Sequence, residues 1–175
     1  ATDAPVAVDA AVAATLEAGL AAAVGKPLLN SCRAARPDMK RLLPLARRWG
    51  AAVVGLTMGA KGIPTTTAQR LKLVEAFVTA ALDVGIALDD IYIDPLMLSA
   101  VQRSPAETFA ALQEIKFNFG VRTILGISNV SHGLPRREAL NVAAYLHAVG
   151  LGLDVAIVNP LEPTMRDAVA ASALI

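Results

Sequence analysis

The 175-residue chain carries 16 Lys and Arg residues against 15 Asp and Glu residues, so its formal net charge at pH 7 is +1. This near-neutral balance, without a stripe of Lys and Arg, argues against nucleic acid as the main partner. The single cysteine, Cys32, excludes an internal disulfide framework and fits a reducing, cytoplasmic environment. Charged residues, Gly or Pro interrupt every long apolar stretch and no signal peptide is visible, so we expect no membrane association.

A chain of this length can form one substantial domain, and no low-complexity linker divides it. We therefore expect residues 1–175 to form a single domain. Hydrophobic residues make up 55% of the chain and aromatic residues 4%, so the core must consist mainly of Ala, Val, Leu and Ile. The chain begins with Ala1 rather than Met, and we expect the natural protein to be longer.

Short apolar runs of strand length recur along the chain, and each is followed by a polar residue. The runs span residues 6–8, 27–29, 51–56, 91–93, 123–127 and 155–158, and the polar residues are Asp9, Asn30, Thr57, Asp94, Asn129 and Asn159. Runs without polar alternation are typical of strands that are covered on both faces, as in parallel sheets.

Ala-rich or amphipathic stretches separate these runs and predict α-helices. They span residues 11–24, 38–49, 70–84, 105–117, 137–149 and 165–174. A glycine lies near the end of each of the first five, where a left-handed C-cap is favoured. These glycines are Gly25, Gly50, Gly85, Gly120 and Gly150.

The alternation of strands and helices predicts an α/β fold, either a doubly wound sheet or a (β/α)8 barrel. No G-x-G-x-x-G motif follows the first strand, which disfavours a Rossmann domain. Polar residues at nearly every strand end favour the TIM-type barrel, whose site lies at the carboxyl ends of its strands. Six βα units are visible, so we expect the first two units to be missing, most simply before Ala1. A barrel without them would have two exposed sheet edges.

Four of the strand-end residues form the main candidate site, with Thr57 and Asn159 as weaker members. The four are Asp9, Asn30, Asp94 and Asn129. Two carboxylates and two amides without a cation do not suit a phosphate. They suit a flat heterocycle rich in N–H donors, such as guanine or a pterin, because a carboxylate can accept two parallel hydrogen bonds. No cluster of His and Cys residues offers a metal site.

Several segments resemble the pterin-binding methyltransferase family. They are "LLNS" (residues 28–31), "GLTMGAKGIP" (55–64), "YIDPL" (92–96) and "GISNVSHGLPRR" (126–137). The resemblance covers the chain from about residue 6 onward and is strongest to the methyltetrahydrofolate:corrinoid protein methyltransferases. These share their fold with the folate domain of cobalamin-dependent methionine synthase and with dihydropteroate synthase. The "IDP" and "SNVS" motifs, about 35 residues apart, are fairly specific as a pair.

The resemblance assigns pterin binding to the residues already selected by position, namely Asp9, Asn30, Asp94 and Asn129. Two departures from the family pattern are Ala10, where Ser is usual, and His132, where an amide is common. The implied reaction is methyl transfer from N5 of methyltetrahydrofolate, or a related tetrahydropterin, to cob(I)alamin carried by a corrinoid protein. Asn129 is then the catalytic contact to N5, no metal is bound directly, and family members tend to be homodimers.

Alternatives remain open on the sequence alone. Dihydropteroate synthase is expected to carry a Ser-Arg-Lys type segment where this chain has the cation-free residues 128–131, and a non-catalytic pterin-binding subunit is a third possibility. A single Asp or Asn at a strand end is often a helix cap or turn residue, and Asn159 before Pro160 suits a turn. Arg33 and Arg36 are candidates to contact the glutamate tail of a folate.

Overall fold

The computed structural model describes residues 4–174, and within this range six strands alternate with six α-helices. The strands are β1 (Ala7–Asp9), β2 (Leu28–Arg33), β3 (Ala52–Leu56), β4 (Ile91–Asp94), β5 (Arg122–Gly126) and β6 (Val155–Ile157). The helices are α1 (Ala13–Ala22), α2 (Arg36–Arg48), α3 (Thr67–Asp83), α4 (Ala106–Phe119), α5 (Arg137–Gly150) and α6 (Pro163–Ser172). The predicted strands and helices are confirmed, with boundaries that differ by a few residues. Two short 3-10 helices, η1 (Leu88–Asp90) and η2 (Ile127–Ser131), were not predicted.

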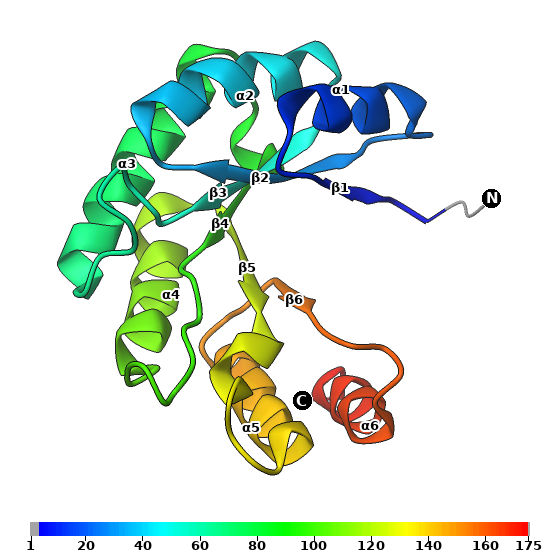
Figure 1. Cartoon of the computed structure of the whole chain (residues 1–175), viewed down its shortest axis with the longest axis vertical. Coiled ribbons are helices and arrows are strands. Elements are labelled where there is room, and N and C mark those ends of the chain that lie inside the picture. Colours follow the sequence, from blue (N-terminus) through cyan, green and yellow to red (C-terminus); the bar gives the residue numbers. More distant parts are fainter. Residues whose placement is uncertain (1–3, 175) are drawn as a thin grey trace.

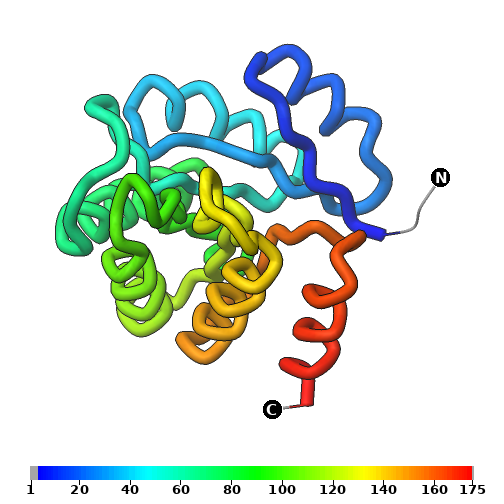
Figure 2. The backbone as a smooth tube through the Cα atoms, turned by 60° about the horizontal axis from the view of Figure 1, so that its bottom comes forward, coloured from blue at the N-terminus to red at the C-terminus, as the bar shows by residue number. Residues whose placement is uncertain are grey.

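The strands form one parallel sheet in the order β1-β2-β3-β4-β5-β6. The sheet curls, and helices cover its convex outer side while the concave face stays open (Figure 1). The backbone trace shows α5 and α6 packed side by side near the β6 end of the curve (Figure 2). The chain therefore forms a partial TIM-type barrel, and the described residues supply six of the eight units that a closed barrel has.

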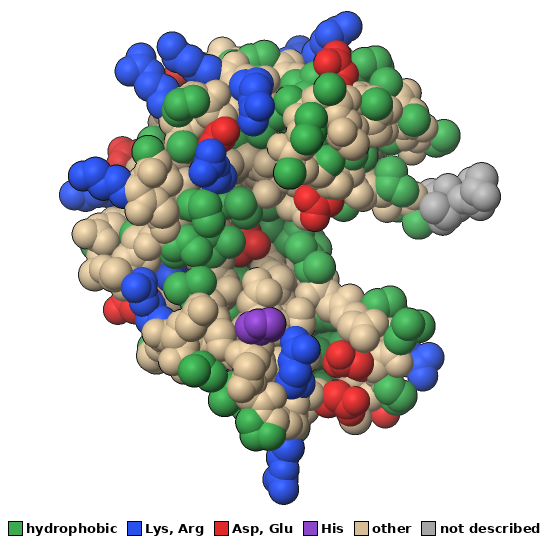
Figure 3. All heavy atoms as spheres, in the orientation of Figure 1, with side chains coloured by type: hydrophobic (Ala, Val, Ile, Leu, Met, Phe, Trp, Pro, Cys, Tyr) green, Lys and Arg blue, Asp and Glu red, His purple; other side chains and the backbone are tan. Residues whose placement is uncertain are grey.

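The two faces of the sheet differ because successive side chains of a strand point to opposite sides. Leu29, Val53, Ile93 and Leu125 are almost fully buried between the sheet and its outer helices. On the opposite side the molecule is deeply hollowed, with a wall that is largely hydrophobic (Figure 3). Helix packing thus accounts for one face of each strand and leaves the other face for a ligand or further structure.

Gly55 in β3 sets how closely α3 approaches the sheet. A Cβ atom at this position would lie 2.5 Å from the ring of Phe77, which is itself buried. Real Cβ atoms do not approach other heavy atoms so closely, so the aromatic ring occupies the space that a side chain would need. Phe77 shares the buried side of α3 with Arg70, Val74 and Ala81.

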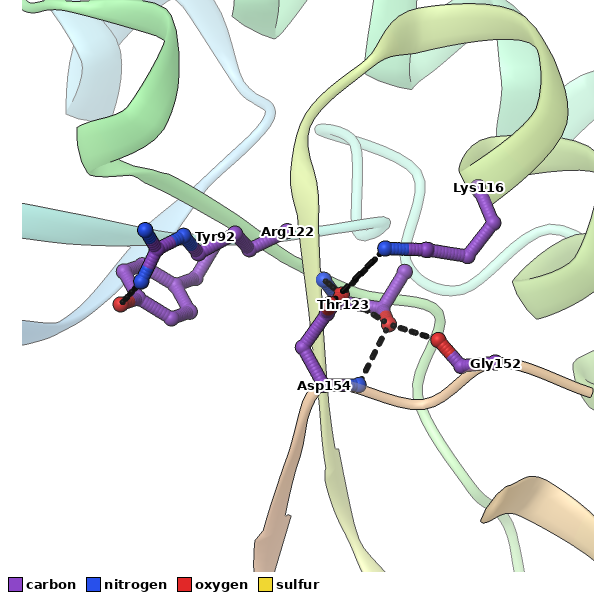
Figure 4. A network of polar contacts seen from close by, with 6 residues as sticks. All are labelled: Tyr92, Lys116, Arg122, Thr123, Gly152 and Asp154. Atoms are coloured by element: carbon purple, nitrogen blue, oxygen red, sulfur yellow. Dashed lines mark hydrogen bonds and ion pairs between the residues drawn. The ribbon is translucent and has the colours of Figure 1, made fainter. Parts of the chain in front are cut away.

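A polar network ties the amino ends of β5 and β6 to α4 (Figure 4). The carboxylate of Asp154 accepts hydrogen bonds from the Thr123 amide (2.7 Å), the Thr123 hydroxyl (2.9 Å) and Lys116 Nζ (2.8 Å). Burial opposes ionisation here, but these hydrogen bonds outweigh it and hold the pKa of Asp154 below its usual value. Beside this network, Arg122 donates to the Tyr92 hydroxyl (3.0 Å).

Glycine conformations confirm the predicted helix ends at four of five positions. Gly25, Gly50, Gly85 and Gly120 have φ between 60° and 83°, a region that non-glycine residues avoid. The prediction for Gly150 was wrong, since that residue ends α5 and Gly152 adopts the left-handed conformation (φ 91°). None of the described helices is long and apolar enough to span a membrane.

Candidate functional site

Three predicted site residues lie toward the carboxyl ends of their strands, although not in one row: through Leu56, Asp94 is level with Arg33, three residues beyond Asn30. Asp9 in β1 lies directly beside Asn30 in β2, and Asp94 ends β4 beside Leu56 of β3. The residue before each of the three packs against the outer helices; these residues are Val8, Leu29 and Ile93. Because side chains alternate along a strand, Asp9, Asn30 and Asp94 project toward the concave face.

β2 carries an irregularity at the site. It pairs with β3 through Leu29↔Val53 and next through Cys32↔Gly55, which is three steps on β2 against two on β3. One extra residue is therefore accommodated between Leu29 and Cys32, where the Asn30–Ser31 peptide bond is cis. Such bulges redirect side chains and are common beside active sites.

Asp94 is buried, with 8% of its surface exposed, and its environment is unusual for a carboxyl group. Burial raises its pKa to about 7, although the Leu96 amide and the positive charge of Arg70 both act in the opposite direction. Its Oδ1 atom accepts a hydrogen bond from the Leu96 amide (2.7 Å), while Oδ2 accepts none from residues 4–174. Asp94 therefore titrates near neutral pH and has unused capacity to accept hydrogen bonds.

Arg70 of α3 supports the segment that follows Asp94, and the sequence did not single it out. Its side chain is 1% exposed, and Nη1 donates to the Pro95 carbonyl and to the Thr108 hydroxyl, both at 2.9 Å. Thr108 in turn donates to the Leu96 carbonyl (3.0 Å). Leu96 itself has a positive φ of 62°, which is uncommon for a residue of this type. The only signal in the sequence was a charged residue on the apolar side of a predicted helix.

Thr57 lies beside Asp94 and is buried, with 1% exposure. Its amide donates to the Asp94 carbonyl (3.0 Å), but its hydroxyl has no hydrogen-bond partner among the described residues. An unpaired buried hydroxyl costs free energy, roughly 1–3 kcal/mol. The role of Thr57 as a weaker member of the candidate site stays a prediction.

Asn129 stands at the same end of the sheet, but in η2 rather than in the strand. β5 ends at Gly126, and the largely buried 3-10 helix η2 carries the exposed Asn129 back over the strand end. Its Nδ2 atom lies 3.5 Å from the place where a Cβ of Gly126 would be. Arg137 of α5 stabilises this turn by donating to the Ser131 hydroxyl (3.1 Å). Residues 128–131 contain no cation, but the positive charge of Arg137 therefore lies beside them.

A hollow of about 340 Å³ adjoins Asp9, and its charged lining comes from β2 and α2. Arg33 Nε donates to Asp38 (2.7 Å), and Arg41 lies 3.6 Å from the other oxygen of the same carboxylate. Asp38 thereby holds two half-exposed guanidinium groups near the mouth of the site. Arg36 is exposed on the outer side of α2 and does not line this hollow.

The single cysteine and the weaker candidate Asn159 have structural roles. Cys32 is buried in the core between sheet and helices, and this burial raises its pKa to about 12, so its thiol is unreactive. Asn159 accepts a hydrogen bond from the Leu161 amide (3.1 Å), which is turn chemistry. In the described part of the chain, no group of three or more His, Cys, Asp or Glu residues is arranged to hold a metal ion.

Comparison with known proteins gives concordant results. Residues 1–159 match the family model described as pterin binding enzyme. The chain is 31% identical over 171 residues to the methionine synthase of Mycobacterium tuberculosis, covering 89% of this chain and 14% of that protein. It is 28% identical over 152 residues to the methylcorrinoid:tetrahydrofolate methyltransferase of Eubacterium limosum, covering 83% of this chain and 55% of that protein.

The structure superposes on solved dihydropteroate synthases. The Yersinia pestis enzyme with a pterine-sulfa conjugate gives a TM-score of 0.76 at 17% identity, over 99% of this chain and 69% of that chain. The Thermus thermophilus enzyme also gives 0.76, at 24% identity, over 98% of this chain and 70% of that chain. At such low identities the likeness shows a shared barrel fold.

Proposed function

The chain belongs to the family of pterin-binding enzymes, and from this premise we propose that residues 1–175 form one pterin-binding domain. The pterin lies on the concave face, held by Asp9, Asn30, Asp94 and Asn129. The observation that supports this proposal most strongly is the buried Asp94 with one unused oxygen, at the end of the sheet where Asp9 and Asn30 also lie side by side.

Asp94 is the principal anchor of the pterin in this proposal. An ionised carboxylate accepts two parallel hydrogen bonds from the amino and N–H groups of the pterin edge. Those donors favour the ionised form, so pterin binding lowers the pKa of Asp94 from about 7. Pterin affinity therefore rises with pH through neutrality, and binding at pH 6 releases a proton. Asp9 completes the contacts to the ring edge, and Asn30 orients the ring.

We propose further that the whole protein is a methyltransferase that takes the methyl group from N5 of methyltetrahydrofolate. The acceptor is cob(I)alamin carried by a corrinoid protein. The names of the two sequence relatives, a methionine synthase and a methylcorrinoid:tetrahydrofolate methyltransferase, support this activity. The chain spans 14% and 55% of those proteins, so the acceptor, a homodimeric assembly and a cytoplasmic location are all part of the proposal.

Asn129 has the catalytic role. The N5–methyl bond breaks as the cobalt electron pair attacks the methyl carbon, and N5 keeps the bonding pair. An amine anion is a poor leaving group, so N5 takes up a proton from solvent by the transition state, and the leaving group is the neutral amine. The amide of Asn129 contacts N5 and strengthens its hydrogen bond as the amine becomes cationic. Its position on a short turn over Gly126 suits a group at the mouth of the site.

The test is methyl transfer from methyltetrahydrofolate to free cob(I)alamin under anaerobic conditions, followed by the loss of cob(I)alamin absorbance. Asn129→Ala is expected to remove turnover and to leave much of the pterin affinity intact. Asn159→Ala is the matched control, because that asparagine also follows a strand but serves a turn. No decay with the wild-type protein, despite tight folate binding, would refute the transferase and favour a binding subunit or another acceptor.

Dihydropteroate synthase is the second candidate function. The segment 128–131 carries no cation of its own, and Arg137 already donates to Ser131, so this segment offers no free cation for pyrophosphate. Incubation with a pterin pyrophosphate and aminobenzoate separates the two activities. Formation of pteroate would establish the synthase.

A further inference from the structure

We propose that Arg70 and Thr108 are positioning residues for Asp94. They hold the backbone of residues 95–96 so that the Leu96 amide is aimed at the carboxylate. The inference rests on the proposed pterin-binding role of Asp94, and it adds two residues, from α3 and α4, that do not touch the proposed pterin. Arg70 and Thr108 lie behind the concave face, in the layer between the sheet and its helices.

The hydrogen bonds form a continuous chain from the two helices to the carboxylate. Arg70 Nη1 donates to the Pro95 carbonyl and to Thr108 Oγ1, both at 2.9 Å. The Thr108 hydroxyl uses its own proton to bind the Leu96 carbonyl (3.0 Å). The opposite side of Leu96, its amide, donates to Asp94 Oδ1 (2.7 Å). Both carbonyls that flank this amide are thus held from the helix side.

The held conformation is one that the backbone does not favour by itself. Leu96 has φ 62°, a left-handed conformation that is unfavourable for a non-glycine residue. Without the bonds from Arg70 and Thr108, the segment could relax and turn the Leu96 amide away. The two side chains therefore maintain the geometry in which Asp94 keeps Oδ2 for a ligand.

Charge adds to this geometric role. Arg70 is the cation that favours ionisation of Asp94, and Asp94 in turn favours the charged form of Arg70. Two other charged groups face Arg70, namely Arg103 before α4 and Glu107 within α4. Glu107 accepts bonds from the Thr67 amide (2.6 Å) and hydroxyl (2.7 Å), so it already has partners of its own.

A contribution to stability alone does not explain why Arg70 is buried. Burial lowers its pKa, and its Nε atom has no hydrogen-bond partner among residues 4–174. Replacing buried charged groups by apolar side chains of similar volume is often neutral or stabilising. A buried guanidinium with an unused donor, next to a carboxylate of the proposed site, is better explained by a role in that site.

Thr108→Val is the first variant, because it keeps the side-chain shape and removes the hydroxyl. Thr108→Ser keeps the hydroxyl and is the matched control. Arg70→Met removes the charge at similar length, and Arg70→Lys keeps the charge but loses the fork geometry. The ligand-independent measurement is the titration of the Asp94 carboxyl carbon by ¹³C NMR in the free protein. The second measurement is the Kd for tetrahydrofolate between pH 6 and 8.

Thr108→Val and Arg70→Met are expected to raise the Asp94 pKa and to move the midpoint of the pH dependence of Kd upward. They should weaken binding at pH 7 about tenfold, whereas Thr108→Ser should match the wild type. Arg70→Lys should keep the Asp94 pKa closer to the wild-type value than Arg70→Met does. A lowered Tm with an unmoved Asp94 titration would show a merely structural role and overturn the proposal.

These outcomes separate the two proposals. If the wild-type protein binds no pterin, the proposed function fails, while the NMR titration still decides whether Arg70 and Thr108 control Asp94. If Arg70→Met does not fold, Thr108→Val carries the same test. If pterin binds and no variant changes the Asp94 titration, the positioning role fails and the proposed function stands.

Discussion

Asp94 and Asp154 stand at opposite ends of the same curled sheet, and the structure treats these two carboxyl groups in opposite ways. Asp154, at the amino end, accepts four hydrogen bonds from Thr123 and Lys116, and its pKa is lowered. Asp94, at the carboxyl end, accepts one hydrogen bond, and burial raises its pKa to about 7. A carboxylate with all its partners stabilises the fold, whereas one with too few partners is available to a ligand.

The same contrast extends to the surroundings of each carboxylate. Near Asp154 the Thr123 hydroxyl both donates and accepts, so the amino end is well satisfied. Near Asp94 the Thr57 hydroxyl and Arg70 Nε have no partner among the described residues. This asymmetry matches the general pattern of TIM-type barrels, in which one end serves stability and the other end serves function.

The largest expected effect is that of Asp94→Asn on ligand binding. The neutral amide offers one acceptor oxygen in place of a carboxylate, and each hydrogen bond to a charged group contributes about 1.5–3 kcal/mol. We expect the Kd for tetrahydrofolate to rise on the order of 100-fold, measured by calorimetry. The Tm should stay the same or increase, because a buried charge is removed. An unchanged Kd would mean that Asp94 does not contact the pterin.

Asp154→Ala should have the reverse profile. It leaves the buried amide and hydroxyl of Thr123 without their acceptor, so we expect the free energy of unfolding to fall by about 2–3 kcal/mol. Denaturant titration measures this loss, and the Kd for tetrahydrofolate should remain within a factor of about two. Lys116→Met removes the half-exposed ion pair alone and should cost about 0.5 kcal/mol or less.

The contributions of the two carboxyl groups to the free energy of unfolding should also change with pH in opposite directions. The Asp94 pKa is raised in the folded state, so its contribution to stability falls as pH rises from about 4 to about 7. The Asp154 pKa is lowered, so its contribution is present above the unfolded pKa and is lost as pH falls through the folded pKa.

Unfolding measured at pH 3, pH 5 and pH 8 tests this difference. Relative to wild type, Asp94→Asn should gain stability at pH 8 compared with pH 5, by on the order of 1 kcal/mol. Asp154→Asn should instead lose its disadvantage below pH 4. If both variants show the same slope as the wild type, neither carboxylate has the environment described above.

A small effect on stability is also expected at Thr57. Thr57→Val replaces an unpaired buried hydroxyl by a methyl group of similar size, so we expect stability to increase by less than about 1 kcal/mol. A several-fold weaker pterin affinity in the same variant would show that the hydroxyl binds the ligand. Unchanged affinity would place Thr57 outside the site.

The order of strands and helices was predictable because buried parallel strands have short, continuous apolar sequences. That Asp9, Asn30 and Asp94 lie toward the same end of the sheet was also predictable, since each follows its apolar run directly and parallel strands share one carboxyl end. The position of Asn129 was harder to predict from the sequence. Its apolar run continues to Ile127 and conceals that β5 ends at Gly126 and passes into a 3-10 turn. A short apolar run has the same appearance in a strand and in a buried helical turn.

Long-range contacts were not predictable from local patterns. Arg70 stands on the apolar side of a predicted helix, but the sequence does not say what it contacts. Its partners, the Pro95 carbonyl and the Thr108 hydroxyl, are known only from the three-dimensional structure. The same holds for the pairing of Arg33 and Arg41 by Asp38, where the sequence had suggested Arg36 in place of Arg41. The extra residue in β2 depends on pairing with β3, which no single strand reveals.

The absent side chain of Gly55 has a consequence at some distance from the glycine itself. Phe77 rests in the space above Gly55, and this contact sets the height of α3 along the sheet. Arg70 lies seven residues earlier on the same helix, about 10 Å nearer to the carboxyl ends of the strands. A methyl group at position 55 would lift or slide the helix and displace the guanidinium from the Pro95 carbonyl. The missing side chain of Gly55 thus helps to align the charge of Arg70 at the carboxyl end of the sheet.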